Sequence, residues 1–564
     1  MSAVRDKPPT AQEVLRRMGS QEEKEVLVDS RLVKDGGVFG ARHVLGAMGF
    51  LGFANVYAMR VNLSVAVVAM VNSSAIPHTN TSAPDSCPDN GFNASTGDVQ
   101  EGEFAWDENM QALILGSFFW GYIITNPLGG RLGEVIGGKW VLGVGVLVTS
   151  LLTLITPIVA RTSTTLLIAT RVVMGLGEGV TFPAMNSLMA RWVPPLERSR
   201  MSSLVYAGAQ FGTVVSLPIC GLLCQGGTIW HGGFAPHLRS AVSGVFLGGW
   251  PAVFYVFGVL GILWFVAWMV LIHNDPSSHP RIHPRERLFI QQSLHHGDVP
   301  TKALPVPYMS IINSMPFWAV FVAHIAQNWG FYTLLTELPT FMKNILHFNI
   351  ANNSFMSALP YLCMWVFSLL AGLLADTLRS RGHLSTTNTR RLFNSIGIYG
   401  PMVCIVLVGY AGCNRGLAIL LLCLGVGLNG AVYSGYMNSH IDIAPNFAGT
   451  LMGITNCAAT VPGFLAPMVV GALVDGKETV GQWKLVFWIA AIVYLVGNTF
   501  YVIFVSGEEQ PWNNLPGSSN SGSSVQASSS GQVASQYRTF SNPEEAEGGA
   551  GNTVSRPRKV PEIF

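Results

Sequence analysis

Twelve apolar runs, each of about 20 residues, constrain this 564-residue chain more than any other feature of its sequence. A helix of that length spans the hydrocarbon core of a bilayer. Only 11% of the residues are charged, whereas a typical soluble domain has about a quarter. We therefore expect an all-α membrane protein with twelve transmembrane helices. The runs are residues 43–71, 109–130, 139–160, 164–190, 203–225, 245–273, 316–344, 354–375, 392–412, 415–438, 447–474 and 483–506.

A polar stretch divides these runs into six and six. It reads HNDPSSHPRIHPRERLFIQQSLHHGDVPTKALP and is too long and too charged to be a turn. The Gly- and Ser-rich end of the chain cannot bury a core, so we expect a disordered tail there. The expected parts are an N-terminal tail (1–42), a first half (43–273), a linker (274–315), a second half (316–506) and a C-terminal tail (507–564).

The orientation follows from the distribution of Lys and Arg among the loops. Alternate loops are rich in basic residues, and such loops face the cytoplasm. Both tails and the linker are therefore expected in the cytoplasm. Asn72, Asn80 and Asn93 begin glycosylation sequons in the opposite loop 72–108, and Asn352 begins another. Lysosomal, vesicular and plasma membranes are all compatible with this pattern.

Two similar segments indicate an internal repeat. GRLGEVIGGK follows the second run and GLLADTLRSR follows the eighth, and their acids, Glu134 and Asp376, are 376 − 134 = 242 residues apart. Parallel six-helix halves of this kind are the architecture of major facilitator carriers. We interpret the segments as a conformational latch, in which the acid pairs with a helix end or an Arg and the Gly permits close helix contact. The latch residues are Gly130, Glu134, Lys139, Gly372, Asp376 and Arg381.

Three ionisable residues are predicted at membrane depth, where a charge costs at least about 2.5–3.5 kcal/mol. Arg60 lies in the first run, and Arg171 and Glu178 share one face of the fourth, with Pro183 expected to interrupt that helix. We expect Arg60 to bind an anion, because its planar fork matches carboxylate and phosphate. Glu178, with Arg171 near it, is expected to couple ions or protons. The alternative is a structural ion-pair network between the first and fourth helices.

The second half offers fewer candidates. Asn328 and Asn438 could donate hydrogen bonds to a substrate, whereas His324 and His440 fit satisfied core positions better. No constellation for a metal, a nucleotide or a catalytic nucleophile occurs, so we expect no enzyme activity and no cofactor beyond a co-transported H⁺ or Na⁺. The net charge of +2 gives no sign of a nucleic-acid partner. The expected partners are a small anion and the lipid bilayer, with the protein a monomer.

Several long segments resemble the anion-transporter family of sialin, the vesicular glutamate transporters and the type I sodium-phosphate cotransporters, within the major facilitator superfamily. They include YAMRVNLSVAVVAMVN, GLGEGVTFPAM, WVPPLERSRM and HIDIAPNFAGTLMGITN, and the resemblance covers about residues 43–508. It implies a proton- or sodium-coupled symporter of organic anions that works by alternating access. It also implies substrate binding by the arginine at Arg60 and coupling by the acid at Glu178.

The departures from this family concern the substrate. The glutamate transporters have a histidine in place of Leu115 and an arginine in place of Gln327, which argues against glutamate here. Sialin has an acid in place of Met174 and a histidine in place of Asn186. Insect members named for inorganic phosphate cotransport share the general pattern. Sialate and other acidic sugars, acidic amino acids and phosphate stay open, and so does a non-transporting sensor or scaffold.

Overall fold

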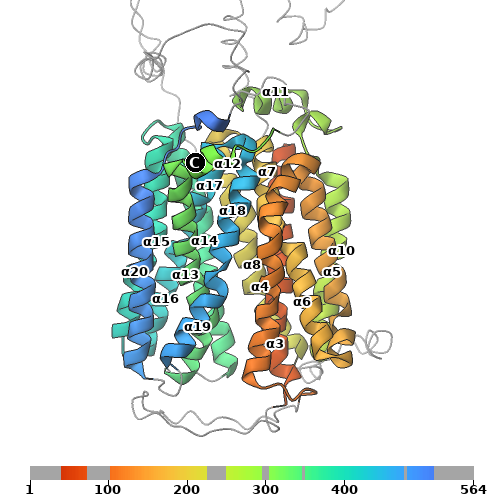
Figure 1. Cartoon of the computed structure of the whole chain (residues 1–564), viewed down its shortest axis with the longest axis vertical. Coiled ribbons are helices and arrows are strands. Elements are labelled where there is room, and N and C mark those ends of the chain that lie inside the picture. Colours follow the sequence, from red (N-terminus) through yellow and green to blue (C-terminus); the bar gives the residue numbers. More distant parts are fainter. Residues whose placement is uncertain are drawn as a thin grey trace, which may run out of the picture. The chain divides into compact units, whose positions relative to one another are not determined.

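The computed structural model describes residues 40–72, 102–224, 249–294, 304–345, 350–474 and 479–513. These residues form long helices that run alongside one another (Figure 1). They contain no β-strand, and one isolated bridge joins Val71 to Phe104. The expected all-α membrane architecture is therefore confirmed.

The helices of the first half follow the predicted runs closely. They are α3 (Ala41–Met70), α4 (Glu108–Leu132), α5 (Gly138–Thr162), α6 (Thr164–Gly179) continued by α7 (Thr181–Trp192), α8 (Arg198–Cys224) and α10 (Trp250–Leu271). A π-helical turn, η2 (Gly133–Gly137), joins α4 to α5, and η3 (Pro195–Glu197) precedes α8. The chain reverses at Gly137, whose φ of 106° favours glycine.

The second half repeats this series. It consists of α13 (Met315–Asn344), α14 (Ile350–Ser380), α15 (Thr386–Tyr410), α16 (Arg415–Asn429) with η6 (Gly430–Tyr433) and α17 (Tyr436–Ile443), η7 (Pro445–Phe447) with α18 (Ala448–Thr460) and α19 (Pro462–Val474), and α20 (Val480–Phe504). Ten stretches of the described residues are long and apolar enough to cross a membrane. One of them, Met110–Thr162, holds both α4 and α5, and α13 lies outside the ten. Counting that stretch as two and adding α13 gives the twelve helices predicted.

The two halves use the same helix pairings. In the first half α3 packs on α8, α4 on α6 and α5 on α10. In the second half α13 packs on α18 and α19, α14 on α16 and α15 on α20. Between the halves α8 packs on α14, and α4 packs on α18. Each half thus contributes its second and fifth helices to the contact with the other.

Pro183 accounts for the division of the fourth predicted helix into α6 and α7. Proline has no N–H to bond the carbonyl four residues earlier, which here belongs to Gly179. The helix stops at that glycine and resumes at Thr181. The break follows directly after Glu178, as the sequence predicts.

The linker contains two short helices, α11 (Pro284–Ser293) and α12 (Tyr308–Ile312). Glu286 of α11 accepts hydrogen bonds from the backbone N–H of Ala41 (2.8 Å) and of Arg42 (3.2 Å), the first residues of α3. The linker therefore lies at the end of the bundle where α3 begins, which we call the linker end (Figure 1). The opposite end, where α3 finishes and α4 begins, is the far end.

The C-terminal tail begins later than predicted. Residues expected to be disordered from 507 onward include a packed segment up to Asn513, with η8 (Pro511–Asn513). Gln510 donates its N–H to the carbonyl of Ile443 (2.8 Å), and Asn513 accepts from the N–H of Asn446 (3.0 Å). Trp512 lies against Phe447. These contacts attach the segment to the α17–α18 connection, which composition alone did not indicate.

Two of the four predicted glycosylation sites, Asn80 and Asn93, lie outside the described residues. Asn72 lies two residues after the end of α3, where its N–H donates to the carbonyl of Phe104 (2.8 Å). Asn352 lies in the first turn of α14.

Candidate functional site

Arg60 and Glu178 form an ion pair inside the first half. Glu178 stands at the middle of the Thr164–Trp192 stretch and is fully buried, and the Arg60 side chain is 10% exposed. The Nε and Nη2 of Arg60 donate to the same carboxylate oxygen, Oε2 of Glu178, at 3.0 and 2.9 Å. The two residues are 118 positions apart. The sequence predicted both at membrane depth, and it predicted an ion pair between the first and fourth helices only as the alternative to substrate binding.

Aromatic rings surround the Arg60 guanidinium. Its carbon lies 4.6 Å from the ring centre of Tyr57, 4.8 Å from that of Tyr122 and 5.1 Å from that of Phe118. The negative faces of such rings attract a cation, especially in a desolvated site. Arg60 therefore keeps favourable electrostatic contacts even when its carboxylate partner changes.

The other oxygen of Glu178, Oε1, is buried without a hydrogen-bond partner. A carboxylate in this position is only half satisfied, which is costly inside a protein. Gly175 and Gly179 hold the helix of Glu178 against α4, because an added Cβ would lie 2.0 Å from the carbonyl oxygen of Phe118 or 2.3 Å from the hydroxyl of Thr125. The acid is thus fixed by close backbone contact, with one oxygen open to a proton or a ligand.

Arg171 lies closer to the far end, on the same helix as Glu178. It is 3% exposed, its Nε has no partner, and its Nη1 lies 3.9 Å from the sulfur of Met174. Its guanidinium is 5.2 Å from the ring centre of Phe118, the same ring that contacts Arg60. Two guanidinium groups and one carboxylate therefore share this region, which leaves an excess of positive charge.

The middle of the second half carries neutral polar groups instead. Gln327 donates to Asn429 (3.1 Å), and Asn328 donates to the carbonyl of Ala459 (2.7 Å). His324 and His440 both bond the hydroxyl of Thr455, at 3.1 and 2.8 Å. Among the described residues, the central turns of these helices contain no Lys or Arg. An anion at the centre would find its cations only on the first half.

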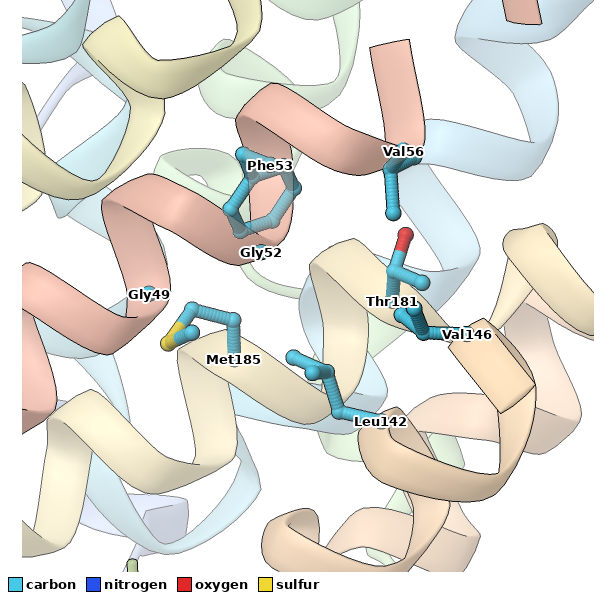
Figure 2. Close-up of a pocket in the computed structure, with 8 residues that line it drawn as sticks. All are labelled: Gly49, Gly52, Phe53, Val56, Leu142, Val146, Thr181 and Met185. Carbon is cyan, nitrogen blue, oxygen red and sulfur yellow. The ribbon is translucent and has the colours of Figure 1, made fainter. Parts of the chain in front are cut away.

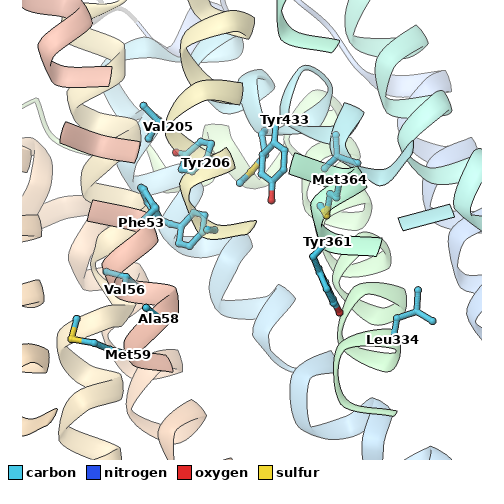
Figure 3. Packing of buried hydrophobic residues seen from close by; sticks show 14 of the residues in the cluster. Phe53, Val56, Ala58, Met59, Val205, Tyr206, Leu334, Tyr361, Met364 and Tyr433 are labelled. Carbon is cyan, nitrogen blue, oxygen red and sulfur yellow. The ribbon is translucent and has the colours of Figure 1, made fainter. Parts of the chain in front are cut away.

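Asn438, predicted as a substrate ligand, lies at a contact between the halves. It is fully buried, its Oδ1 accepts from the hydroxyl of Ser202 (2.6 Å), and its Nδ2 donates to the carbonyl of Tyr433 (2.6 Å). Tyr433 also accepts from Gln210 of the first half and stacks on Tyr206, with ring centres 5.9 Å apart (Figure 3). These contacts join α8 to the η6–α17 region.

The predicted latch acids each bond the start of a helix in the opposite half. Glu134 accepts from the N–H and the hydroxyl of Thr450 in α18, both at 2.7 Å. Asp376 accepts from the N–H groups of Ser199 (3.2 Å) and Arg200 (2.7 Å) in α8. Free N–H groups and the helix dipole make a helix start favourable for a carboxylate.

The latch glycines permit the helices of the two halves to approach each other closely. A Cβ on Gly130 would lie 2.1 Å from the carbonyl oxygen of Gly449, and one on Gly372 would lie 2.7 Å from the Cβ of Ser203. The basic residues beside the acids are Arg131 (3.3 Å) and Arg379 (3.8 Å). The sequence predicted Lys139 and Arg381 in that role, but Lys139 lies over Trp140 and Arg381 is exposed. The i, i+3 spacing of Arg131 and Arg379 from the acids places them on the same helix face.

A buried charge cluster completes the contact at the linker end. Asp442 accepts from Arg198 of the first half (2.9 Å) and from Arg390 of its own half (2.7 Å). Arg390 also donates to the hydroxyl of Ser199 (2.8 Å). In the sequence, Arg198 and Arg390 contribute only to the basic loops that indicate the orientation. Three charged residues near helix ends could have indicated an ion-pair cluster. Their burial could not be predicted, because it depends on contact with the other half.

One small pocket lies between α3, α5 and α7 (Figure 2). Its lining is apolar except for the hydroxyl of Thr181, so it offers nothing to an anion; the other residues are Gly49, Gly52, Phe53, Val56, Leu142, Val146 and Met185. No cluster of three or more His, Cys, Asp or Glu suited to a metal ion occurs within the described ranges.

Comparison with known proteins places this geometry in context. The profile of the Major Facilitator Superfamily matches residues 49–467. A Drosophila melanogaster protein named "Putative inorganic phosphate cotransporter" is 46% identical over 480 residues, which are 84% of this chain and 87% of that protein. Human sialin is 44% identical over 473 residues, 84% of this chain and 90% of sialin. The proton:xylose symporter XylE has a similar fold, with a TM-score of 0.58 and 14% identity over 83% of this chain and 96% of that one.

Proposed function

Because the chain belongs to the Major Facilitator Superfamily of membrane transporters, we propose that it is a symporter that moves a small organic monoanion together with a proton. The observation that carries this proposal is the buried Arg60–Glu178 pair at the centre of the first half. In this proposal Arg60 binds the anion and Glu178 takes up the proton. The linker end faces the cytoplasm, in keeping with its basic loops.

The pair supports coupling because the anion and Glu178 compete for one guanidinium. While Glu178 is ionised, it accepts hydrogen bonds from the Nε and Nη2 of Arg60, so these two donors are not available to an anion. Once Glu178 is protonated, Arg60 would be a buried cation without a counter-charge, which is strongly unfavourable. An anion relieves this cost, so proton and anion bind best together. This mutual dependence is the thermodynamic requirement for symport.

The charges of the site favour a monoanion. With Glu178 neutral, Arg60 is the cation beside the anion, because Arg171 lies about two helical turns from Glu178 toward the far end. The second half supplies hydrogen-bond donors such as Gln327 and Asn328 without a further cation. An organic acid with hydroxyl or amide groups, such as sialate or glucuronate, suits this combination. A dianion would place its second charge against the neutral groups of the second half or about two helical turns from Arg60, without a cation beside it.

A proton suits the site better than Na⁺. Glu178 is the only acid in the central turns of the membrane helices that the structure describes, and its Oε2 already accepts both bonds from Arg60. A sodium ion would need several oxygen ligands around one point, whereas a proton needs only the free Oε1.

The decisive experiment is uptake into proteoliposomes with phosphate, sialate, glucuronate, aspartate and glutamate, each with and without Na⁺ and a pH gradient. We expect sialate or glucuronate uptake that an inward-directed proton gradient drives and that Na⁺ does not change. Symport of one proton with one monoanion is electroneutral, so a valinomycin-imposed potential should have no effect. Uptake that depended on Na⁺, or none for any anion, would contradict the proposal.

Inorganic phosphate is a second candidate, since the Drosophila relative is named for it. Monovalent H₂PO₄⁻ would fit the same single charge. The same assay separates the two candidates, because it measures phosphate uptake and sialate uptake individually. If both anions are carried, each should inhibit uptake of the other, since both would bind Arg60. A non-transporting sensor would bind an anion but show no flux.

A further inference from the structure

A side chain of the second half is hydrogen-bonded to the aromatic shell of Arg60. Asn456 of α18 donates one amide N–H to the hydroxyl of Tyr122 (3.1 Å) and the other to Oδ1 of Asn126 (2.6 Å), both on α4. An amide has two N–H groups, so both bonds form at once. Asn456 is 6% exposed, and Tyr122 and Asn126 are buried. This contact between the halves is therefore protected from water.

Tyr122 receives a different contact on its ring face. The guanidinium of Arg60 lies 4.8 Å from its ring centre. The phenol is rigid, so a displacement of the ring carries the hydroxyl with it. A hydrogen bond of 3.1 Å weakens when its length grows by a few tenths of an ångström. The position of Arg60 and the bond to Asn456 are therefore mechanically linked.

Tyr122 also senses the helix that carries Glu178. A Cβ on Gly179 would lie 2.5 Å from the carbonyl oxygen of Tyr122, and one on Gly175 would lie 2.9 Å from its nitrogen. Such close backbone contact transmits displacement, because packed interiors have little free space. Around the pair, the charged and titratable groups of the described residues are Tyr57 on α3, Tyr122 on α4, Arg171 on α6 and Tyr332 on α13.

We propose that Asn456 is a coupling residue, which ties the second half to the Arg60–Glu178 site through the hydroxyl of Tyr122. When Arg60 turns from Glu178 toward an anion, the Tyr122 ring shifts, the bond to Asn456 breaks, and the contact between α4 and α18 loosens. The inference rests on the proposed function. It adds the path by which occupancy of the first half changes the closure of the two halves.

Matched variants separate this path from a general loss of contact. Tyr122→Phe keeps the ring face for Arg60 and removes only the hydroxyl. Asn456→Ala removes both bonds from the second half. Asn126→Ala is the control, because it removes the other bond of Asn456 and leaves the link to Tyr122 in place. Each variant is first compared with the wild type for monodispersity and melting temperature.

The measurement is the distance between spin labels at the far ends of the two halves, for the full chain in liposomes. It is taken between about pH 8 and about pH 5, with and without sialate. In the wild type we expect acid and sialate to shift the distance distribution. In Tyr122→Phe and Asn456→Ala, we expect the shift that acid and sialate cause in the distance distribution to fall by about 3- to 10-fold, the effect of one hydrogen bond. Asn126→Ala should change the starting distribution but keep the shift.

A full shift in Tyr122→Phe would overturn the inference, and so would an equal loss in Asn126→Ala. If sialate has no effect on the wild type but acid does, the anion assignment of the proposed function fails. The coupling path is then judged on the acid response alone. If Tyr122→Phe does not fold, Tyr122→Trp offers another ring without the hydroxyl, and Asn456→Ala decides with it.

Discussion

The two halves of this transporter share a fold but differ in the chemistry at their centres. The first half holds Arg60, Arg171 and Glu178 there, and the second holds Gln327–Asn429 and the His324–Thr455–His440 group. At the linker end the halves are alike, since Glu134 and Asp376 each bond the start of a helix across the contact. The repeat has thus kept the same device at the end and diverged in the middle. The halves are therefore alike where they bond each other at the linker end and differ in the charges at their centres.

The largest expected effect comes from removing the arginine that distinguishes the centre of the first half from that of the second. Arg60→Ala should lower anion uptake at least about 100-fold, because loss of a buried ionic partner costs about 3 kcal/mol or more. Arg60→Lys keeps the charge but loses the planar fork, and should fall between the alanine variant and the wild type. Initial rates in proteoliposomes measure both. Wild-type uptake by Arg60→Ala would remove the first half from substrate binding.

The second prediction separates the proton from the anion. Glu178→Gln removes the carboxylate partner of Arg60 at every pH, as protonation does in the wild type. Anion exchange should therefore continue, while the pH gradient no longer drives accumulation. In the wild type, one pH unit should support about tenfold accumulation, since it is worth about 1.4 kcal/mol. Counterflow and net uptake are measured side by side. Accumulation that still followed the gradient would assign coupling elsewhere, and the His324–Thr455–His440 group would be tested next.

The third prediction concerns the similar ends. Glu134→Gln and Asp376→Asn should each open the linker end, because each removes a charged acceptor of two hydrogen bonds, worth about 1.5–3 kcal/mol apiece. We expect the population open at the linker end to rise by about tenfold or more in both variants. Labelling of a cysteine introduced in that contact measures the population. Effects that differ by more than about tenfold would show that the ends are unlike as well.

The latch glycines should show where this likeness is incomplete. A Cβ on Gly130 would lie 2.1 Å from the backbone oxygen of Gly449, whereas one on Gly372 would first meet the Cβ and the hydroxyl of Ser203, at 2.7 and 2.8 Å. We therefore expect a larger fall in melting temperature and uptake for Gly130→Ala. Equal losses would show that the two contacts are equally tight, and Gly372→Ala combined with Ser203→Gly, which removes both contacting atoms, would then restore part of the loss.

The sequence predicted the fold well because membrane helices are specified locally. A run of about 20 apolar residues identifies a span without knowledge of its neighbours. Burial of a charge is also local information, and it singled out Arg60 and Glu178. The π-turn between α4 and α5 and the packed segment up to Asn513 were missed, since neither has a compositional signature.

The partners within the site could not be predicted in the same way. The Arg60–Glu178 pair, 118 residues apart, was predicted only as an alternative, and the contact of Asn456 with Tyr122, 334 residues away, was not predicted. Which helix faces align depends on the packing of α3 on α8, of α4 on α6 and of α4 on α18, which one helix's periodicity does not contain. Arg390 illustrates this point, because it reads as an orienting surface charge and is fully buried against Asp442. The repeat helped only at the linker end, where the halves remained alike.

The smallest effect is expected for a second Arg–Glu pair of the first half. Arg161 and Glu103 also make bonds of 2.9 Å, but their side chains are 51% and 45% exposed at the far end. The hydrogen bond from Arg161 lowers the pKa of Glu103. A lowered folded-state pKa stabilises the protein above the unfolded value of about 4.3, and this is lost only as the pH falls through the folded value.

Glu103→Gln should therefore leave uptake unchanged and lower the melting temperature by no more than about 2 °C, as for an exposed pair. That small difference should be constant between about pH 5 and 8 and vanish in stronger acid. Melting curves across this range measure it, with Glu178→Gln compared for uptake. A change in pH-driven uptake in Glu103→Gln would mean that burial is not what distinguishes the two pairs. If pH-driven uptake is unchanged in Glu103→Gln and lost in Glu178→Gln, an Arg–Glu pair couples transport only where the bilayer and the protein exclude water.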